Sequence, residues 1–262
     1  AAVLTVDPGG SGNYTALSDA IFGSADGDIV LMARRNYDLN APAQTVPGRE
    51  VSAVFVINKS ITIDGNGSNL TFHTTVTEAN FFIDQHNVAM RNMIIGQNTS
   101  VQGGVGIQTK GFTDLSIPLV NLTLENLTFD RLNKGIYLAK TNLSRINNIT
   151  TNGAGTGVLL KESNNINITN SKFDASTADD VSLWSVTGMR IENLTLGKAV
   201  FFDTSANVYS RTVASTTPPG IAGIQIETYE ISGPCSTICG AIIPYNGTRA
   251  AELNINESTI AV

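Results

Sequence analysis

Two adjacent carboxylates are the residues of this chain best suited to catalysis. Asp179 and Asp180 come directly before the apolar stretch Val181–Trp184. A pair of carboxyl groups can act on a glycosidic bond, because one protonates the leaving oxygen while the other activates water. The alternative is a solvated turn before a strand, and the sequence favours it because no further catalytic groups accompany the pair. Both residues are therefore weak catalytic candidates.

The other titratable side chains form no recognisable catalytic set. The only histidines, His73 and His86, lie beside a loop and in a turn, where surface histidines are common. Arg91, Arg145 and Arg190 fall at outward positions next to a predicted bend and indicate a solvated edge. The sequence contains no Ser-His-Asp order, phosphate loop or metal-binding cluster. No cofactor is predicted.

The two cysteines, Cys235 and Cys239, are separated by three residues. A zinc site usually needs four ligands, and both histidines are distant in sequence, so no metal is predicted here. A local disulfide is the first expectation in an exported protein, and a cross-link between subunits is the alternative. Acidic loop residues such as Asp26 and Asp28 leave a structural calcium ion open.

Asparagine supplies a third kind of chemistry, because Asn-x-Ser/Thr triplets can accept N-linked sugars. The chain contains 13 such triplets among its 26 Asn and 49 Ser plus Thr residues, whereas chance gives about 5. Three of them, Asn126, Asn148 and Asn193, occupy a repeated bend where their side chains would stack in a ladder with little room for sugar. The other ten are predicted glycosylation sites: Asn13, Asn58, Asn66, Asn69, Asn98, Asn121, Asn142, Asn167, Asn246 and Asn256.

The bend belongs to a five-residue repeat, apolar-x-apolar-x-Asn. Clear copies are Leu122–Asn126, Ile166–Asn170 and Met189–Asn193, and an earlier copy, Ile61–Gly65, ends in Gly. The fifth positions of all six copies lie 27, 34, 22, 22 and 23 residues apart, at Gly65, Asn92, Asn126, Asn148, Asn170 and Asn193. Alternating apolar residues predict short strands, and Asn or Gly tolerates the left-handed backbone of a sharp bend. A period near 22 residues with period-2 strands indicates a β-solenoid.

Each repeat carries about three strands, which together make one turn of a parallel β-helix. Further strands are predicted about ten residues after each bend, at Gly135–Leu138, Gly157–Leu160, Val181–Trp184 and Val200–Phe202. Turns stack ~4.8 Å apart, so every strand pairs with the turns above and below. The longer intervals predict loops, and Gln97–Gly104 and Gly111–Pro118 hold the extra residues of the 34-residue interval.

The ends of the repeat differ from its middle. Tyr14, Leu17, Ala20 and Ile21 form one helical stripe and predict a short helix that covers the open core. Gly27–Met32 is expected to be the first full strand. The template disappears near Ser205, so we expect a β-helix with its cap over residues 1–204 and a non-repeating cap or assembly segment over residues 205–262.

Composition favours an exported all-β protein with one long core. Hydrophobic residues make up 42% of the 262 residues, whereas charged residues make up only 15%. The net charge of −6 argues against a nucleic-acid partner. No run of about 20 apolar residues is present, so no transmembrane segment is predicted. The start at Ala1, without Met, suits a mature exported chain.

Several stretches resemble the opening of right-handed parallel β-helix repeat proteins, the pectin-lyase-like domains of archaeal and bacterial cell surfaces. They are Val6–Thr15, Ala20-Ile21, Gly27-Asp28, Tyr37 and Asn58–Gly65. The resemblance covers roughly residues 3–204 and implies a right-handed parallel β-helix at the cell surface. It does not select an activity, because lyases, hydrolases, esterases, adhesins and envelope proteins share this fold.

The active-site patterns of the family's enzymes are incomplete here. Hydrolases of the polygalacturonase type need an Asn-Thr-Asp triplet about one turn before the paired carboxylates, and later Gly-His-Gly and Arg-x-Lys. The preceding turn here reads Gly155–Val158, and no histidine follows His86. The patterns of pectate lyases and pectin methylesterases are not present in context either.

The sequence therefore favours an extracellular structural protein, such as a glycosylated subunit of a sheath or surface layer. Its main partner would be further copies of itself, and an envelope polysaccharide is a further possible partner. Unpaired strands at the ends of the solenoid are expected sites of pairing between subunits. A carbohydrate-binding or adhesion module and a polysaccharide-active enzyme centred on Asp179 and Asp180 stay open as alternatives.

Overall fold

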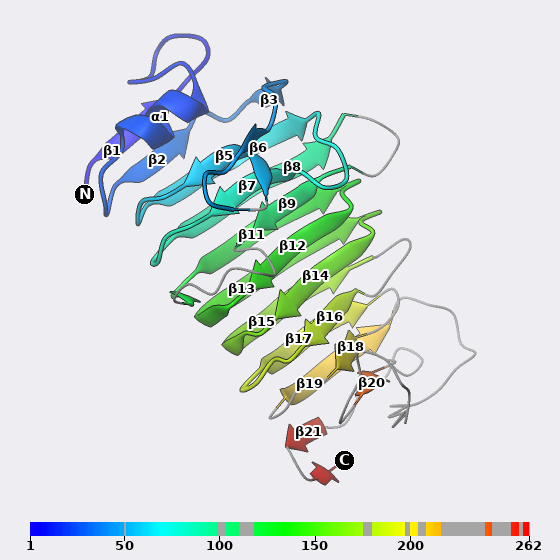
Figure 1. Ribbon diagram of the computed structural model, residues 1–262. Coiled ribbons are helices and arrows are strands. Elements are labelled where there is room, and N and C mark those ends of the chain that lie inside the picture. The colour runs from blue at the N-terminus through cyan, green and yellow to red at the C-terminus, as the bar shows by residue number, and fades with distance from the viewer. Residues whose placement is uncertain are drawn as a thin grey trace.

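The structure is a right-handed parallel β-solenoid of about 7 turns (Figure 1). It is a computed structural model that describes residues 1–49, 51–98, 103–109, 118–174, 180–196, 200–203, 208–215, 239–242, 253–256 and 259–261. Side chains are described as far as residue 196. Strands make up 60% of the fold and helix only 4%, which confirms the predicted all-β class.

The described strands form two sheets that run the length of the solenoid. The larger sheet has the order β1 (Val3–Val6), β2 (Ile29–Met32), β6 (Thr62–Phe72), β8 (Ala89–Gln97), β11 (Thr123–Asp130), β13 (Thr141–Asn152), β15 (Asn164–Phe173), β17 (Arg190–Leu196), β19 (Val208–Ser215), β21 (Leu253–Asn256) and β22 (Thr259–Ala261). Two short strands join it at the side, β3 (Asn36–Leu39) on β6 and β10 (Leu119–Val120) on β13.

The smaller sheet, called sheet B below, closes each turn. Its order is β4 (Gln44–Thr45), β5 (Ser52–Ile57), β7 (Ala79–Ile83), β9 (Val105–Gln108), β12 (Lys134–Ala139), β14 (Thr156–Lys161), β16 (Val181–Trp184), β18 (Val200–Asp203) and β20 (Cys239–Ile242). The strands that the sequence predicted after each bend are β12, β14, β16 and β18. All four lie in this sheet, as predicted. The two short strands predicted on either side of each bend are instead one continuous strand, so a turn consists of one long bent strand and one strand of sheet B.

The repeated asparagines are the bends of the larger sheet. Left-handed backbone angles occur at Asn92, Asn126, Asn148, Asn170 and Asn193, with φ between 52° and 59°. Each long strand, such as β11, continues through its bend and therefore faces two directions. Asparagine tolerates this conformation better than most side chains do. The predicted role of the fifth position is thus confirmed for these copies.

The first copy of the repeat bends differently from the prediction. Its left-handed residues are Asn66 and Gly67, with φ of 51° and 77°, and Gly65 is not among them. The register between β6 and β8 shifts at this point, so residues 65–67 together oppose Asn92. Gly65 is small for another reason, because a Cβ there would overlap Met93 and the carbonyl of Asn92. A bulge replaced the simple bend.

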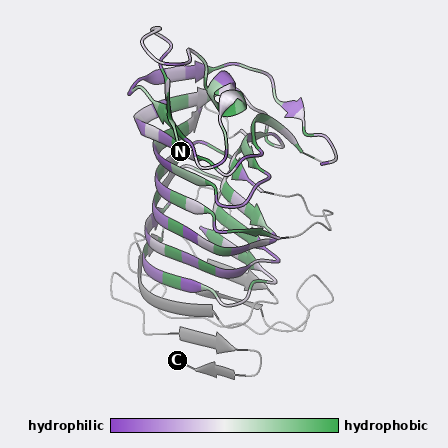
Figure 2. Cartoon of the chain, turned by 90° about the vertical axis from the view of Figure 1, so that its left-hand side faces the viewer, coloured by the Kyte–Doolittle hydropathy of each residue, from purple (hydrophilic) through white to green (hydrophobic). Residues whose placement is uncertain are grey.

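The core consists of columns of side chains, in which each inward position of one turn lies on the equivalent position of the next turn. The third residue of each repeat pairs with its counterparts in neighbouring turns and is fully buried, or 0% exposed, throughout: Ile63, Met90, Leu124, Ile146, Ile168 and Ile191. Figure 2 shows the resulting alternation of apolar and polar residues along the strands. Parallel stacking in register therefore buries one apolar residue on the next.

A short helix packs at the N-terminal end, as the sequence predicted. Helix α1 (Leu17–Gly23) buries Leu17, Ala20 and Ile21 against the core (Figure 1). Tyr14 lies before the helix, where it bridges to Val6, so its predicted place on the helical stripe was wrong. The predicted first strand was also wrong, because β1 precedes β2 and pairs with it in parallel.

The parallel sheet continues past the predicted boundary at residue 204. Strand β19 pairs in parallel with β17, in the register Leu194 with Val213. Beyond it the pairing becomes antiparallel, because β21 lies on β19, β22 lies on β21, and β20 lies on β18. A change from parallel to antiparallel pairing ends the solenoid at this side.

Candidate functional site

The bend asparagines form a hydrogen-bonded ladder along the outside of the solenoid. Asn126 donates from Nδ2 to Oδ1 of Asn92 at 2.9 Å, and Asn148 donates in the same way to Asn126 at 2.7 Å. Asn193 donates to Asn170 at 2.8 Å, and Asn170 donates to Asn147 at 2.9 Å. Because each amide is both donor and acceptor, the ladder links successive turns. The predicted stacking is confirmed from Asn92 to Asn148 and from Asn170 to Asn193, whereas Asn170 bonds to Asn147 and not to the bend residue Asn148.

A second corner beside the ladder has one bond of the same kind and includes a predicted glycosylation site. Asn121 donates from Nδ2 to Oδ1 of Asn87 at 2.8 Å, and both residues have left-handed backbone angles. The same corner continues through Leu143, Asn165 and Gly188. Asn121 points outward and is exposed, as predicted, but its Nδ2 atom already joins two turns. This corner is hard to recognise in the sequence, because its residues share a left-handed backbone but not a residue type.

The solenoid itself explains why many sequons are present. At a bend, the asparagine is followed by an inward apolar residue and then by an outward threonine, as in Asn126, Leu127 and Thr128. The same alternation along a strand produces the triplets at Asn69 and Asn167. A period-2 pattern that starts at Asn therefore creates Asn-x-Thr or Asn-x-Ser without reference to sugar. The high number of Asn-x-Ser/Thr triplets is therefore not by itself an indication of N-glycosylation.

The predicted glycosylation sites differ in how their amides are used. Asn13 accepts from the Thr5 N–H at 2.9 Å, Asn142 accepts from the Asn164 N–H at 3.2 Å, and Nδ2 of Asn98 lies 3.3 Å from Nδ1 of His73. The exposed residues with no hydrogen bond to the side-chain amide among the described residues are Asn58, Asn66 and Asn167. Asn69 is half-buried. Asn246 and the side chain of Asn256 lie outside the described residues, and so does Asp179.

The solvated-turn interpretation of Asp180 is wrong. Asp180 is 0% exposed and lies immediately before β16. It continues a column of three glycines, Gly106, Gly135 and Gly157, where a Cβ would overlap a neighbouring carbonyl or an inner phenylalanine ring. A carboxyl group enclosed at such a corner is not open to a polymeric substrate. Asp180 therefore fits a structural role better than a catalytic one.

The arginines beside the bend are paired with carboxylates across or along the strands. Arg91 donates from Nε to Oδ2 of Asp64 at 2.8 Å, and an Arg190 nitrogen lies 2.6 Å from Oε1 of Glu192. Burial raises the pKa of Asp64, but hydrogen bonds from Asn92, the Asn66 N–H and Arg91 outweigh it, so the pKa lies below its usual value. These groups form the polar edge that the sequence indicated.

Both histidines contact neighbouring turns. His86 accepts the Val120 N–H at Nδ1, at 3.1 Å, and its own carbonyl accepts from the Ser60 hydroxyl at 2.8 Å. His73 lies 2.6 Å from Asp38 through Nε2. Their contacts are with structural neighbours from other turns, which agrees with the sequence-based preference for non-catalytic histidines.

The acidic loop residues considered for calcium bind backbone amides. Asp28 accepts the Ala2 N–H at 2.6 Å through Oδ1 and the Ala25 N–H at 2.9 Å through Oδ2. These two bonds, together with the nearby N-terminus and Lys59, lower the pKa of Asp28 against a smaller effect of burial. Asp26 accepts the Ser60 N–H at 2.8 Å. Within the described part of the chain, no group of three His, Cys, Asp or Glu residues is placed to hold a metal ion.

One stretch of the outer face of sheet B carries partly buried aromatic and cationic groups. Tyr137 lies in register with Gln108, Leu159 and Ser182, and each of these alternates with core residues. Burial raises the pKa of Tyr137 to about 12, and the Glu162 carboxylate adds to this effect. Burial also lowers the pKa of Lys134 and of Lys161. No residue of this column is among the site residues predicted from the sequence.

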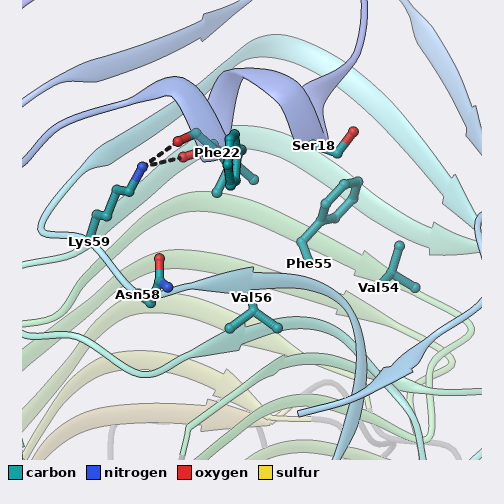
Figure 3. Close-up of a pocket in the computed structure, with 8 residues that line it drawn as sticks. Ser18, Phe22, Val54, Phe55, Val56, Asn58 and Lys59 are labelled. Atoms are coloured by element: carbon teal, nitrogen blue, oxygen red, sulfur yellow. Dashed lines mark hydrogen bonds between the residues drawn. The ribbon is translucent and has the colours of Figure 1, made fainter. Parts of the chain in front are cut away.

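A pocket of about 290 Å³ lies between α1 and β5 and is called the α1 pocket below (Figure 3). Its lining residues come from the helix and from the strand with its following turn: Ser18, Ile21, Phe22, Val54, Phe55, Val56, Asn58 and Lys59. Phe22 is 86% exposed, which makes it the most exposed of the large apolar residues described. It lies off the buried stripe of α1, and an aromatic residue at such a position was the signal available in the sequence.

Lys59 fixes one wall of this pocket. Its Nζ donates to the carbonyls of Ser24 at 2.6 Å and Ile21 at 3.3 Å, and also to that of Phe22. Lys59 also lies 5.8 Å from the centre of the Phe22 ring. A cation at the C-terminus of a helix satisfies carbonyls that have no partner inside the helix. The pocket therefore has one polar wall, formed by the hydrogen-bonded Lys59, and one apolar wall.

Comparison of the chain with protein-family models and with curated proteins found no match. The family resemblance of the opening segments is thus a matter of a few motifs. No helix in the described residues is both long and apolar enough to cross a membrane. Cys235 lies outside the described residues and Cys239 is described only as backbone of β20, so the disulfide stays a prediction.

Proposed function

We propose that the protein is an extracellular structural subunit, part of a glycosylated cell-envelope sheath or surface layer that assembles from copies of this chain. We further propose that it belongs with the pectin-lyase-like β-helix proteins of archaeal and bacterial surfaces. The observation that supports this most is the amide ladder from Asp64 and Asn92 to Asn148, which links one turn to the next on the outer surface. Such repeated linkage stiffens a shaft without creating a reactive centre.

The placement of the titratable residues supports a scaffold over an enzyme. Asp180 is enclosed, Asp64 is bonded to Arg91, and His86 accepts a backbone N–H from the next turn. General acid–base catalysis needs groups that converge on an accessible substrate. In the described residues, these side chains instead point to separate structural contacts.

The two ends of the solenoid differ in their capacity for assembly. At the N-terminal end, the outer edge of β1 is covered, because Tyr14 donates to the Thr5 carbonyl at 3.0 Å and Asp7 donates to the Tyr14 carbonyl at 2.9 Å. Asn13 accepts the Thr5 N–H. Such covered edges resist pairing with another chain. Assembly through strand addition at β1 is therefore disfavoured, and we expect contacts through the long sides or the C-terminal end.

Electron microscopy of the native material tests this proposal. Tubes or sheets built from the protein would support a structural subunit, and deletion of residues 232–262 should weaken them if the C-terminal segment makes the contact. Discrete monomers under native conditions would contradict it. A purified protein that cleaves a polysaccharide, and loses this activity in Asp180→Asn, would favour the enzymatic alternative instead.

A carbohydrate-binding module is a second candidate, favoured by the outer face of sheet B. Tyr137 and Trp184 both point away from the core there, with Gln108 and Ser182 as polar neighbours. Aromatic rings with polar groups beside them are suited to sugar faces. Binding to a glycan array that is lost in Tyr137→Ala, without any assembly by the native protein, would favour this function over the first.

A further inference from the structure

We propose that Asn58 carries an N-linked glycan whose first sugar lies in the α1 pocket, against the ring of Phe22. The inference rests on the proposed extracellular function, since a chain that is not exported would not meet the transfer machinery. It goes further, because it selects one residue among many sequons and gives the attached sugar a binding site on the protein.

The position of Asn58 separates it from the sequons that the solenoid explains. It is the first residue after β5 ends at Ile57, so it lies outside the inward and outward alternation of a strand. Its side chain is exposed and points toward the space below α1 (Figure 3). No bond to another described side chain holds its amide, in contrast to Asn121 and Asn126, whose Nδ2 atoms donate to neighbouring turns.

The pocket beside Asn58 has the chemistry of a site for a neutral sugar. Phe22 and the half-buried Val54 and Val56 offer apolar surface, while Ser18 is a polar group at the opposite side (Figure 3). A pyranose ring has an apolar C–H face and a polar rim, so it matches such a surface. The pocket of about 290 Å³ lies near the lower limit for small-molecule sites, which suits one or two sugar units.

The hydrogen-bonding capacity of the pocket also argues for a neutral ligand. Lys59 is its only cationic lining residue, and its ammonium group already donates to three carbonyls at the end of α1. An ammonium group has three donors, so none remains for an incoming acid. No carboxylate lines the pocket either. A neutral hexose or N-acetylhexosamine therefore fits better than a uronate or a phosphorylated sugar.

The attachment itself is an ordinary glycosyl transfer from a phosphate-activated, lipid-linked sugar donor, carried out by a transferase of the host. Nδ2 of Asn58 attacks the anomeric carbon, and the new C–N bond forms as the C–O bond to the donor phosphate breaks. The phosphate leaves with the bonding electron pair, and one amide proton passes to a base of the transferase. The triplet Asn58-Lys59-Ser60 supplies the required acceptor sequence.

Peptide mapping of the native protein by mass spectrometry tests the attachment. We expect the peptide with Asn58 to carry a glycan, and an amidase that removes N-glycans should convert Asn58 into Asp. An unmodified Asn58 overturns the inference even if Asn167 is modified and the protein assembles. Modification at Asn58 without assembly would instead contradict the proposed structural function and leave the inference standing.

Thermal unfolding tests whether the sugar occupies the pocket. In protein made by the native host, Asn58→Gln should lower the Tm by about 2–4 °C, whereas Asn167→Gln, on an open strand face, should leave it unchanged. In a Phe22→Ser background, loss of the glycan should have little further effect, because the apolar wall is already gone. An equal effect of Asn58→Gln with and without Phe22 would overturn the pocket assignment. Phe22 is exposed, so Phe22→Ser should not prevent folding.

Discussion

At the corners of the solenoid, individual residues are selected by backbone conformation as much as by side-chain chemistry. Asn92, Asn126 and Asn148 combine a left-handed backbone with an amide that bonds to the next turn. Leu143 has the same conformation, with φ of 51°, but it is 64% exposed and has no amide. A branched apolar residue at such an angle carries backbone strain without compensation from burial.

Replacing Leu143 by asparagine should stabilise the protein. Leu143 lies in the corner occupied by Asn121 and Asn165 in the neighbouring turns. Asparagine relieves the strain and places an amide next to that of Asn121, so Leu143→Asn should raise the free energy of unfolding by about 1 kcal/mol. Urea denaturation measures the change. Leu143→Ile, which is β-branched, should lower stability, and a stabilising effect of isoleucine would contradict the explanation.

Asp64 should make stability depend on pH in the acidic range. Its folded-state pKa lies below the unfolded value, because hydrogen bonds from Asn92, the Asn66 N–H and Arg91 outweigh the opposite effect of burial. The ionised side chain therefore contributes stability above the unfolded pKa of about 3.9, and this contribution is lost as the pH falls through the folded pKa.

Asp64→Asn tests this pH dependence. The variant should be less stable by about 1 kcal/mol at neutral pH, after allowance for the solvent around Arg91. The difference from the wild-type protein should be constant above about pH 5 and shrink as the pH falls below about 4. Unfolding curves measured across this range check the expectation. A difference that does not change with pH would show that the carboxylate charge is unimportant.

At the scale of elements, α1 depends on a side chain from the turn after β5. The helix has only seven residues, no side chain caps its N-terminus, and it contains no basic residue in its last turn. A helix this short is not stable by itself. Its stability therefore comes from the burial of Leu17, Ala20 and Ile21 and from the Lys59 ammonium at its C-terminal carbonyls.

Lys59→Met should loosen the N-terminal end of the solenoid. The substitution keeps an unbranched side chain but removes three charge-assisted bonds, so we expect a loss of about 2 kcal/mol. Amide hydrogen exchange in α1 should become faster, whereas exchange in β13 and β15 should change little. Lys172→Met, on the exposed face of β15, is the matched control and should have a negligible effect. Equal behaviour of the two variants would contradict the capping role.

At the scale of the whole molecule, the solenoid has one covered end and one end built from antiparallel strands. The cover at β1 consists of the Tyr14 backbone and the Asn13 side chain. Stacked strands expose backbone groups at their last edge, and exposed edges recruit other chains. The asymmetry limits how copies can join, since the two ends do not offer the same surface.

Asn13→Ala should increase self-association through the N-terminal end, because the Thr5 N–H loses its acceptor. Asn13→Asp keeps an acceptor at the same place while it also removes the sequon, so it separates edge protection from glycosylation. Sedimentation velocity at several concentrations measures the association. We expect Asn13→Ala to form larger species than both Asn13→Asp and the wild-type protein. Identical profiles would show that Asn13 does not protect the edge.

The periodic parts of the fold were predictable, and the irregular ones were not. The strands and the bends from Asn92 to Asn193 follow from alternation and from the tolerance of asparagine for left-handed angles. The bulge at Gly65 was missed, because its two extra residues are visible only when β6 pairs with β8. The burial of Asp180 was also missed, since it arises only when β16 pairs with β14 in the stacked turns.

The sequence by itself determined the local conformation and the period, because both depend on interactions between residues close in the chain. It therefore set the solenoid class, the bends and the buried stripe of α1. Only the tertiary structure decided which amides meet across turns, that Asp180 is enclosed and that Phe22, Val56 and Asn58 surround one pocket. Those relations join residues more than 20 positions apart, and their geometry arises only when the turns stack.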